Sequence, residues 1–181
     1  MKPIIFSAPM VRAGQTRRVV KGVFDDIWVK TKHPYNTEHF IGVKNESTIE
    51  IKCPYGKPGD ILWVRETFYK HRHIGMKFSD EYEALPDNLK PYYRKCSPIF
   101  MSKWASRTTL KISDVRVERL QEISEEDAIG ACKANRGDDA ISEGILAVAS
   151  FADIWNSING KKHPWASNPW VWVIDFERVG R

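Results

Sequence analysis

The chain of 181 residues is poor in cysteine and has no apolar run close to the length of a membrane-spanning helix. Cys53, Cys96 and Cys132 are odd in number and far apart, which does not suggest a disulfide framework. A spanning helix needs about 20 apolar residues. No Cys-x-x-Cys or His-x-x-x-His pair is present, so no metal site is expected. These absences predict a soluble, cytoplasmic protein that does not enter membranes.

Several motifs that mark enzyme classes are also missing. The sequence has no phosphate-binding loop, no dinucleotide-binding glycine fingerprint and no nucleophile elbow. We therefore expect no cofactor, and most enzymes that can be identified from a short motif are excluded.

The residues that are present describe a single globular domain over 1–181. Hydrophobic residues make up 42% of the chain and charged residues 28%, which is too apolar for a disordered chain. The net charge is +5, and it is unevenly spread. Residues 1–120 carry 22 basic and 13 acidic side chains (+9), whereas residues 121–181 carry 6 and 10 (−4). A basic body of this kind favours a polyanionic partner.

The hydrophobic pattern predicts an α+β fold that is mainly β: a small β-barrel with flanking helices. Strands are expected at 4–6, 19–20, 27–29, 48–52, 61–65, 108–120 and 170–176. Within 108–120 the apolar positions change face at Ser113-Asp114, which indicates a β-bulge. Capping sequences predict helices that begin after Ser124 and after Ser150. Residues 70–103 are basic, aromatic and aperiodic, and are expected to form a long irregular insertion, with a short helix near 79–84.

Two groups of residues are candidates for binding a polyanion. The first is a basic cluster on either side of Gly14: Arg12, Arg17, Arg18 and Lys21. Guanidinium groups bind phosphate in a bidentate manner and stack on planar bases, although a solvated basic surface is the plainer interpretation.

The second group lies at the end of the insertion, where Trp104 stands between Lys103 and Arg107. Its indole could stack on a base or simply cover the surface. Arg65 and Glu66 are adjacent at a strand end and form either a site pair or a structural ion pair.

Five blocks in order resemble the phage and prophage branch of the ASCH-domain family. They are Pro3-Ile-Ile-Phe-Ser-Ala-Pro-Met-Val-Arg12, Gln15-Thr-Arg-Arg-Val-Val-Lys21, Gly59-Asp-Ile-Leu-Trp-Val-Arg-Glu-Thr67, Trp155-Asn-Ser-Ile-Asn-Gly160 and Asn168-Pro-Trp-Val-Trp-Val-Ile-Asp-Phe176. The resemblance spans nearly the whole chain. It implies a PUA-like β-barrel and binding of RNA or of a modified pyrimidine nucleoside.

Some members of this family are amidohydrolases that remove the acyl group of N4-acetylcytidine with a threonine nucleophile, a lysine and a glutamate. The resemblance places the threonine on Thr16 and the signature arginine on Arg18, but Ala13 stands where the lysine is expected. The glutamate falls on Glu143 if the second of two similar segments is aligned, and on Ala131 if the first is used.

The resemblance therefore leaves two main functions open. One is binding of RNA or a modified nucleoside. The other is hydrolysis of an acylated cytidine, in which Thr16 would attack and Glu143 would transfer protons; a ribonuclease is a third alternative. An unactivated threonine hydroxyl is a poor nucleophile, so the missing lysine favours binding.

Overall fold

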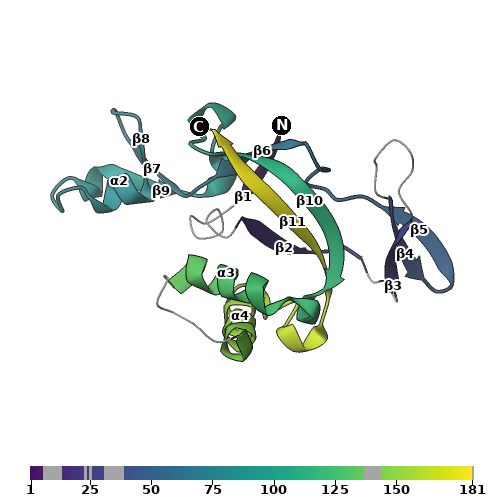
Figure 1. The fold of residues 1–181 in the computed structure, drawn as a ribbon. Coiled ribbons are helices and arrows are strands. Elements are labelled where there is room, and N and C mark those ends of the chain that lie inside the picture. Colours follow the sequence, from purple (N-terminus) through teal and green to yellow (C-terminus); the bar gives the residue numbers. More distant parts are fainter. Residues whose placement is uncertain (6–13, 23, 25, 31–38, 137–143, 181) are drawn as a thin grey trace.

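The computed structural model describes residues 1–5, 14–22, 24, 26–30, 39–136 and 144–180. Its central sheet has the strand order β1-β6-β10-β11-β2 (Figure 1). The strands are β1 (Lys2–Ile5), β2 (Gln15–Val19), β6 (Ile61–Arg65), β10 (Thr109–Arg119) and β11 (Trp170–Gly180). Strands β1 and β6 are parallel, and the other pairs are antiparallel. Strand β2 is thus an edge strand of the sheet, and one side of its backbone is left unpaired by the sheet.

The sequence of β11 explains why the sheet has two apolar faces. Alternate side chains of a strand point to opposite faces. Val171 and Val173 pack with the helices, whereas Trp172, Ile174 and Phe176 belong to the core on the other face. The register of β10 against β11 shifts between Ile112 and Asp114, so the predicted bulge is confirmed.

Helices α3 (Glu125–Arg136) and α4 (Gly144–Asn159) cover one face of this sheet (Figure 1). The hydroxyl of Ser124 accepts a hydrogen bond from the backbone N–H of Asp127 at 3.1 Å, which confirms the predicted cap of α3. The prediction that the second helix begins after Ser150 is wrong, because Ser150 lies within α4. Ala147 is buried against α3 in the shared core, and this packing carries the helix upstream of the capping sequence.

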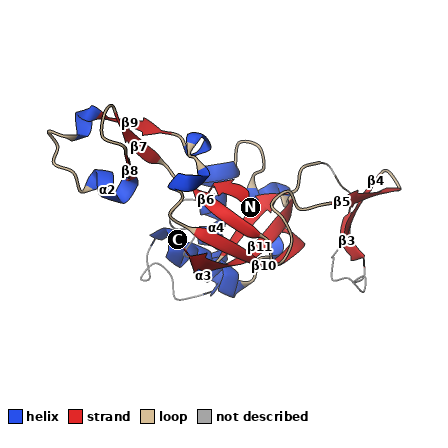
Figure 2. Ribbon diagram, turned by 90° about the horizontal axis from the view of Figure 1, so that it is seen from above, coloured by secondary structure: helices blue, strands red, loops and turns tan. Residues whose placement is uncertain are grey.

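A second sheet lies at one end of the body and consists of β3 (Asp26–Lys30), β4 (His39–Lys44) and β5 (Ser47–Ile51) (Figure 2). Its Phe40 ring packs edge-on against Trp172 of β11, with ring centroids 4.8 Å apart. Ile27 is buried in the same core. These contacts join the small sheet to the face of the central sheet that the helices leave open.

Residues 68–96 form a third sheet at the opposite end of the molecule, here called the arm (Figure 2). The arm contains β7 (Phe68–His71), β8 (Met76–Phe78), α2 (Ser79–Glu83) and β9 (Tyr93–Cys96). The expected short helix is confirmed, but the expectation of an irregular insertion is wrong. Its strands are only three or four residues long and place basic residues next to one another or next to aromatic ones, so the sequence shows no sustained period of two.

The β-rich α+β class is confirmed. The described strands form three separate sheets, none of which closes into a barrel, so the closed barrel expected from the sequence is not observed. In the part of the chain that the structure describes, no helix has the length and apolarity needed to cross a membrane.

Candidate functional site

A cavity of about 320 Å³ lies between the edge strand β2 and the two helices. Its apolar wall comes from Phe151, Ile154 and Trp155 of α4. Tyr55, which precedes β6, contributes an aromatic ring from elsewhere in the chain. Trp155 is held in place by a hydrogen bond from its Nε1 to the carbonyl oxygen of His163, 2.7 Å away. The cavity therefore has a rigid aromatic lining of a kind typical of small-molecule sites.

Thr16 lies in this cavity, at the position on β2 that pairs with Ile174. It is one of the few buried polar residues, with 6% of its surface exposed. Among the described residues, its hydroxyl makes no hydrogen bond to a side chain that could remove its proton. Two carboxylates from the first turn of α3, Glu126 and Asp127, line the same cavity. Arg12, Ala13 and Glu143 lie outside the described residues.

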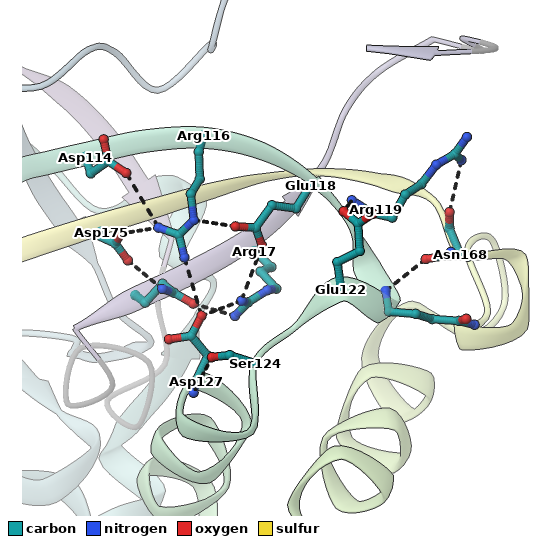
Figure 3. A network of polar contacts seen from close by, with 12 residues as sticks. Arg17, Asp114, Arg116, Glu118, Arg119, Glu122, Ser124, Asp127, Asn168 and Asp175 are labelled. Atoms are coloured by element: carbon teal, nitrogen blue, oxygen red, sulfur yellow. Dashed lines mark hydrogen bonds and ion pairs between the residues drawn. The ribbon is translucent and has the colours of Figure 1, made fainter. Parts of the chain in front are cut away.

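Arg17 is held by carboxylates rather than presented to solvent (Figure 3). Its Nη2 lies 2.8 Å from Asp127 Oδ2 and 3.8 Å from Glu118 Oε2, and only 5% of the side chain is exposed. The side-chain oxygen of Gln15 accepts a further hydrogen bond from Arg17 Nη1. Arg17 thus forms part of the polar edge of the cavity, with its charge already balanced.

Arg116 of β10 extends this network across the sheet (Figure 3). Its guanidinium pairs with Glu118 and Asp175, and its Nη2 lies 3.4 Å from Asp127. Partial burial acts to raise the pKa of Asp127, but the hydrogen bond and charge of Arg17, with help from Gln15 and Arg116, bring that pKa below its usual value. Asp127 is therefore an ionised hydrogen-bond acceptor at neutral pH.

Arg18 points to the opposite face of the sheet from Arg17, because the two are neighbours on one strand. Its Nη2 donates a hydrogen bond to the carbonyl oxygen of Ile5 at 2.7 Å. Burial lowers the pKa of Arg18, an effect that Tyr55 partly opposes. Lys21 lies beyond the end of β2 and is exposed. The structure therefore separates Arg17, Arg18 and Lys21, although Arg17 and Arg18 both line the cavity.

The second predicted group lies where the arm meets the body. Arg107 donates to Glu66 Oε2 at 2.8 Å and to Asp80 on α2 at 2.9 Å, and its guanidinium lies 3.8 Å from the centre of the Phe78 ring. Arg65 instead lies over the ring of Trp63, 4.7 Å from its centre. Within the described chain no ion pair joins Arg65 to Glu66. Glu66 and Arg107 thus belong to a structural clamp between arm and body.

Trp104 and Lys103 are exposed, in a single 3-10 turn (Lys103–Ala105). Trp104 is 83% exposed and borders a second cavity, of about 600 Å³, on one face of the arm. Lys70, Arg94 and Phe100 line the same cavity. The sequence indicated Trp104 as a contact residue but gave no reason to place Lys70 and Arg94 beside it, because the arm strands were not expected.

Nothing in the described ranges suggests a metal centre, since no group of three or more His, Cys, Asp or Glu side chains is positioned to hold an ion. The two histidines of the His71-x-His73 pair serve a turn, in which the backbone N–H of His73 donates to His71 Nδ1 at 2.9 Å. Comparisons with family models, with curated proteins and with solved structures give no match to this chain.

Proposed function

We propose that this chain is a cytoplasmic RNA-binding protein of the ASCH type, with a PUA-like fold, that holds a pyrimidine nucleoside in the cavity beside β2. One observation carries the proposal: the cavity combines aromatic side chains of α4 with a polar edge that contains a guanidinium and a carboxylate. The sequence resemblance supports the same ligand class. At about 320 Å³ the cavity lies at the lower end of the range for small-molecule sites, which suits one nucleoside.

The polar edge matches the hydrogen-bonding pattern of cytosine. The exocyclic N4 amino group of cytosine is a donor and is accepted by Asp or Glu in protein–nucleic acid contacts. Asp127, which its neighbours keep ionised, and Glu126 supply such acceptors in the cavity. Asn159 carries an amide donor suited to the ring nitrogen or the carbonyl of the base, whereas the Gln15 amide already donates to Asp175 Oδ1 at 2.6 Å. A neutral nucleoside suits this lining better than free phosphate, because Arg17 is already paired.

Gly130 of α3 gives a direct test, because it lines the cavity and a Cβ added there meets no atom within 4 Å. Gly130→Leu should fill the cavity without disturbing the helix. Isothermal titration with cytidine, uridine and adenosine should show binding of cytidine to the wild type and a loss of at least tenfold in Gly130→Leu. Lys133→Leu, an exposed change on the same helix, serves as the control and should bind normally. Equal affinity of wild type and Gly130→Leu would overturn the cavity as the site.

Hydrolysis of an N4-acylated cytidine is the second candidate, and one observation favours it: Thr16 and the carboxylates of Glu126 and Asp127 line one cavity. Glu126 makes no ion pair among the described residues and is the candidate for the base that a threonine nucleophile needs. Thr16 lies on the face of β2 that Arg18 shares, so Thr16 and Glu126 meet in this cavity only around the edge of the strand. Incubation with N4-acetylcytidine, followed by chromatography of released cytidine, tests this function. Turnover that disappears in Thr16→Val while N4-acetylcytidine still binds would establish catalysis. Binding without turnover in the wild type supports the binding function.

A further inference from the structure

One face of the arm carries a basic hollow that is separate from the cavity beside β2. The hollow is the cavity of about 600 Å³ whose lining includes three cations and three aromatic rings: Lys70, Arg72, Arg94, Phe68, Phe100 and Trp104. None of the described residues that line it is acidic. Phe68 and Met101 belong to a small buried core that forms its floor. The hollow is thus a concave surface with an apolar base and cationic walls.

The cations of the hollow differ from the three arginines that form ion-pair networks elsewhere in the described chain. Arg17, Arg107 and Arg116 are each neutralised by two or more carboxylates. In contrast, Lys70, Arg72 and Arg94 are exposed and make no ion pair with any described residue. Lys70 and Arg94 also lie directly opposite each other on β7 and β9. Like charges in such a cross-strand pair destabilise a sheet, and an anion bound between them would relieve the repulsion.

Two aromatic rings stand at the edge of the hollow with little protein around them. Trp104 is 83% exposed and Phe100 is 77% exposed. Such rings offer flat faces on which nucleic acid bases stack in a way that tolerates any sequence. Cations beside stacking platforms are the combination by which proteins hold single strands, with phosphates on the cations and bases on the rings.

We propose that the arm hollow binds single-stranded nucleic acid, with phosphates at Lys70, Arg72 and Arg94 and bases on Trp104 and Phe100. This inference rests on the proposed RNA-binding function and extends it to a second surface. A bound RNA strand would then place one nucleoside in the cavity beside β2. Its sugar–phosphate backbone would contact the arm. The concave shape of the hollow favours a chain-like polyanion over a flat lipid surface.

Fluorescence anisotropy of labelled twelve-residue oligouridine and oligodeoxythymidine tests the inference. Three phosphate contacts predict that log K falls with log salt with a slope of about −2 for a single strand. Trp104→Ala should weaken binding by about tenfold, within the range measured for loss of one stacked base. Trp104→Phe should restore most of that affinity. The double variant Lys70→Gln/Arg94→Gln keeps one phosphate contact, so the slope of log K against log salt should become shallower, at about −0.7.

The matched control removes two exposed lysines elsewhere, Lys133→Gln with Lys161→Gln, and should leave oligomer affinity and slope unchanged. Circular dichroism of each variant establishes that the exposed changes leave the fold intact. Unchanged oligomer binding in both Trp104→Ala and the Lys70/Arg94 variant would overturn the inference. The inference would also be overturned if polyglutamate or phosphatidylserine vesicles competed fully with the oligomers and their binding depended equally on these residues.

The two proposals fail in different ways. Gly130→Leu should weaken binding of free cytidine at least tenfold and leave the salt slope for oligouridine unchanged, whereas Trp104→Ala should weaken binding of oligouridine and leave binding of free cytidine unchanged. If Gly130→Leu removes oligomer binding and the Trp104 and Lys70/Arg94 variants have no effect, the oligonucleotide binds in the cavity beside β2 alone, and the arm inference is overturned. If cytidine does not bind but oligomer binding still depends on Trp104, the nucleoside site beside β2 is overturned and the single-strand site on the arm is supported.

Discussion

Arg17 of β2 donates a hydrogen bond to Asp127 of α3 at 2.8 Å, and this contact joins the edge strand of the central sheet to the first turn of the helix that covers it (Figure 3). The pair lies on the polar edge of the cavity beside β2. Its geometry therefore determines both how α3 sits on the sheet and which hydrogen-bonding groups a ligand meets.

Removing Arg17 should be destabilising. The Arg17→Ala change takes away the buried partner of Asp127 and Glu118. Arg116 still pairs with both carboxylates, so the expected cost is that of lost hydrogen bonds to charged groups, about 1.5–3 kcal/mol. Urea unfolding measures the free energy of unfolding of the variant. Lys21→Ala, an exposed change just beyond the same strand, should shift it by less than about 0.5 kcal/mol. A cost for Arg17→Ala as small as that of Lys21→Ala would show that the pair contributes little.

Stability should fall in acid through Asp127. Its pKa in the folded protein lies below the value of about 3.9 expected for the unfolded chain. The unfolded state therefore binds the proton first, so the stabilisation is present above about pH 4 and is lost as the pH falls through the folded pKa. Between pH 5 and pH 3 the free energy of unfolding should fall less in Asp127→Asn than in the wild type. Asp153→Asn, an exposed change on α4, should keep the wild-type pH dependence.

Strands β6 and β11 were predictable because their side chains are apolar on both faces, whereas the polar β2 was expected only at its last residue. Ile61–Arg65 and Trp170–Phe176 are buried runs, and the change of face in β10 marked its bulge. The arm strands were not predictable in this way. Lys70 and Arg94 occupy positions that a half-buried strand normally gives to apolar residues, because that face is open to solvent at the hollow.

The candidate site was predictable in part, and the strand period explains the rest. Adjacent cations in the sequence suggested one cluster, yet alternation on β2 sends Arg17 to the helices and Arg18 to the other face. The same alternation directs Glu66 away from Arg65 and toward Arg107, which is distant in the sequence. Tyr55 was missed because it stands in a turn-rich segment, where the sequence pattern carries no information about which cavity the ring borders.

Two glycines at helices should respond in opposite ways to alanine. Gly130 has open space at its Cβ position within α3, so Gly130→Ala should stabilise the protein by about 0.5–1 kcal/mol. A Cβ at Gly160 would overlap with the carbonyl oxygen of Asn156, to which Gly160 donates its own backbone hydrogen bond. Gly160→Ala should cost roughly 1–3 kcal/mol, as overpacking does. Thermal unfolding of both variants gives the comparison, and shifts of the same sign would contradict it.

The clamp around Arg107 should control the mobility of the arm separately from that of the body. Arg107 joins Glu66, at the end of β6, to Asp80 and Phe78 of the arm. Asp80 is largely exposed, so solvent screening weakens that ion pair. The half-buried pair with Glu66 and the stacking on Phe78 therefore contribute most of the stabilisation.

Arg107→Ala should accordingly increase hydrogen exchange of the backbone amides in β7, β8 and β9, while the amides of β10 and β11 exchange as in the wild type. Asp80→Asn should have a much smaller effect than Glu66→Gln, because only Glu66 is shielded from water. Lys95→Ala removes an exposed arm cation that forms no ion pair in the described chain, and provides the control. Faster exchange spread evenly over arm and central sheet would mean that Arg107 stabilises the whole fold, and that the arm does not open by itself.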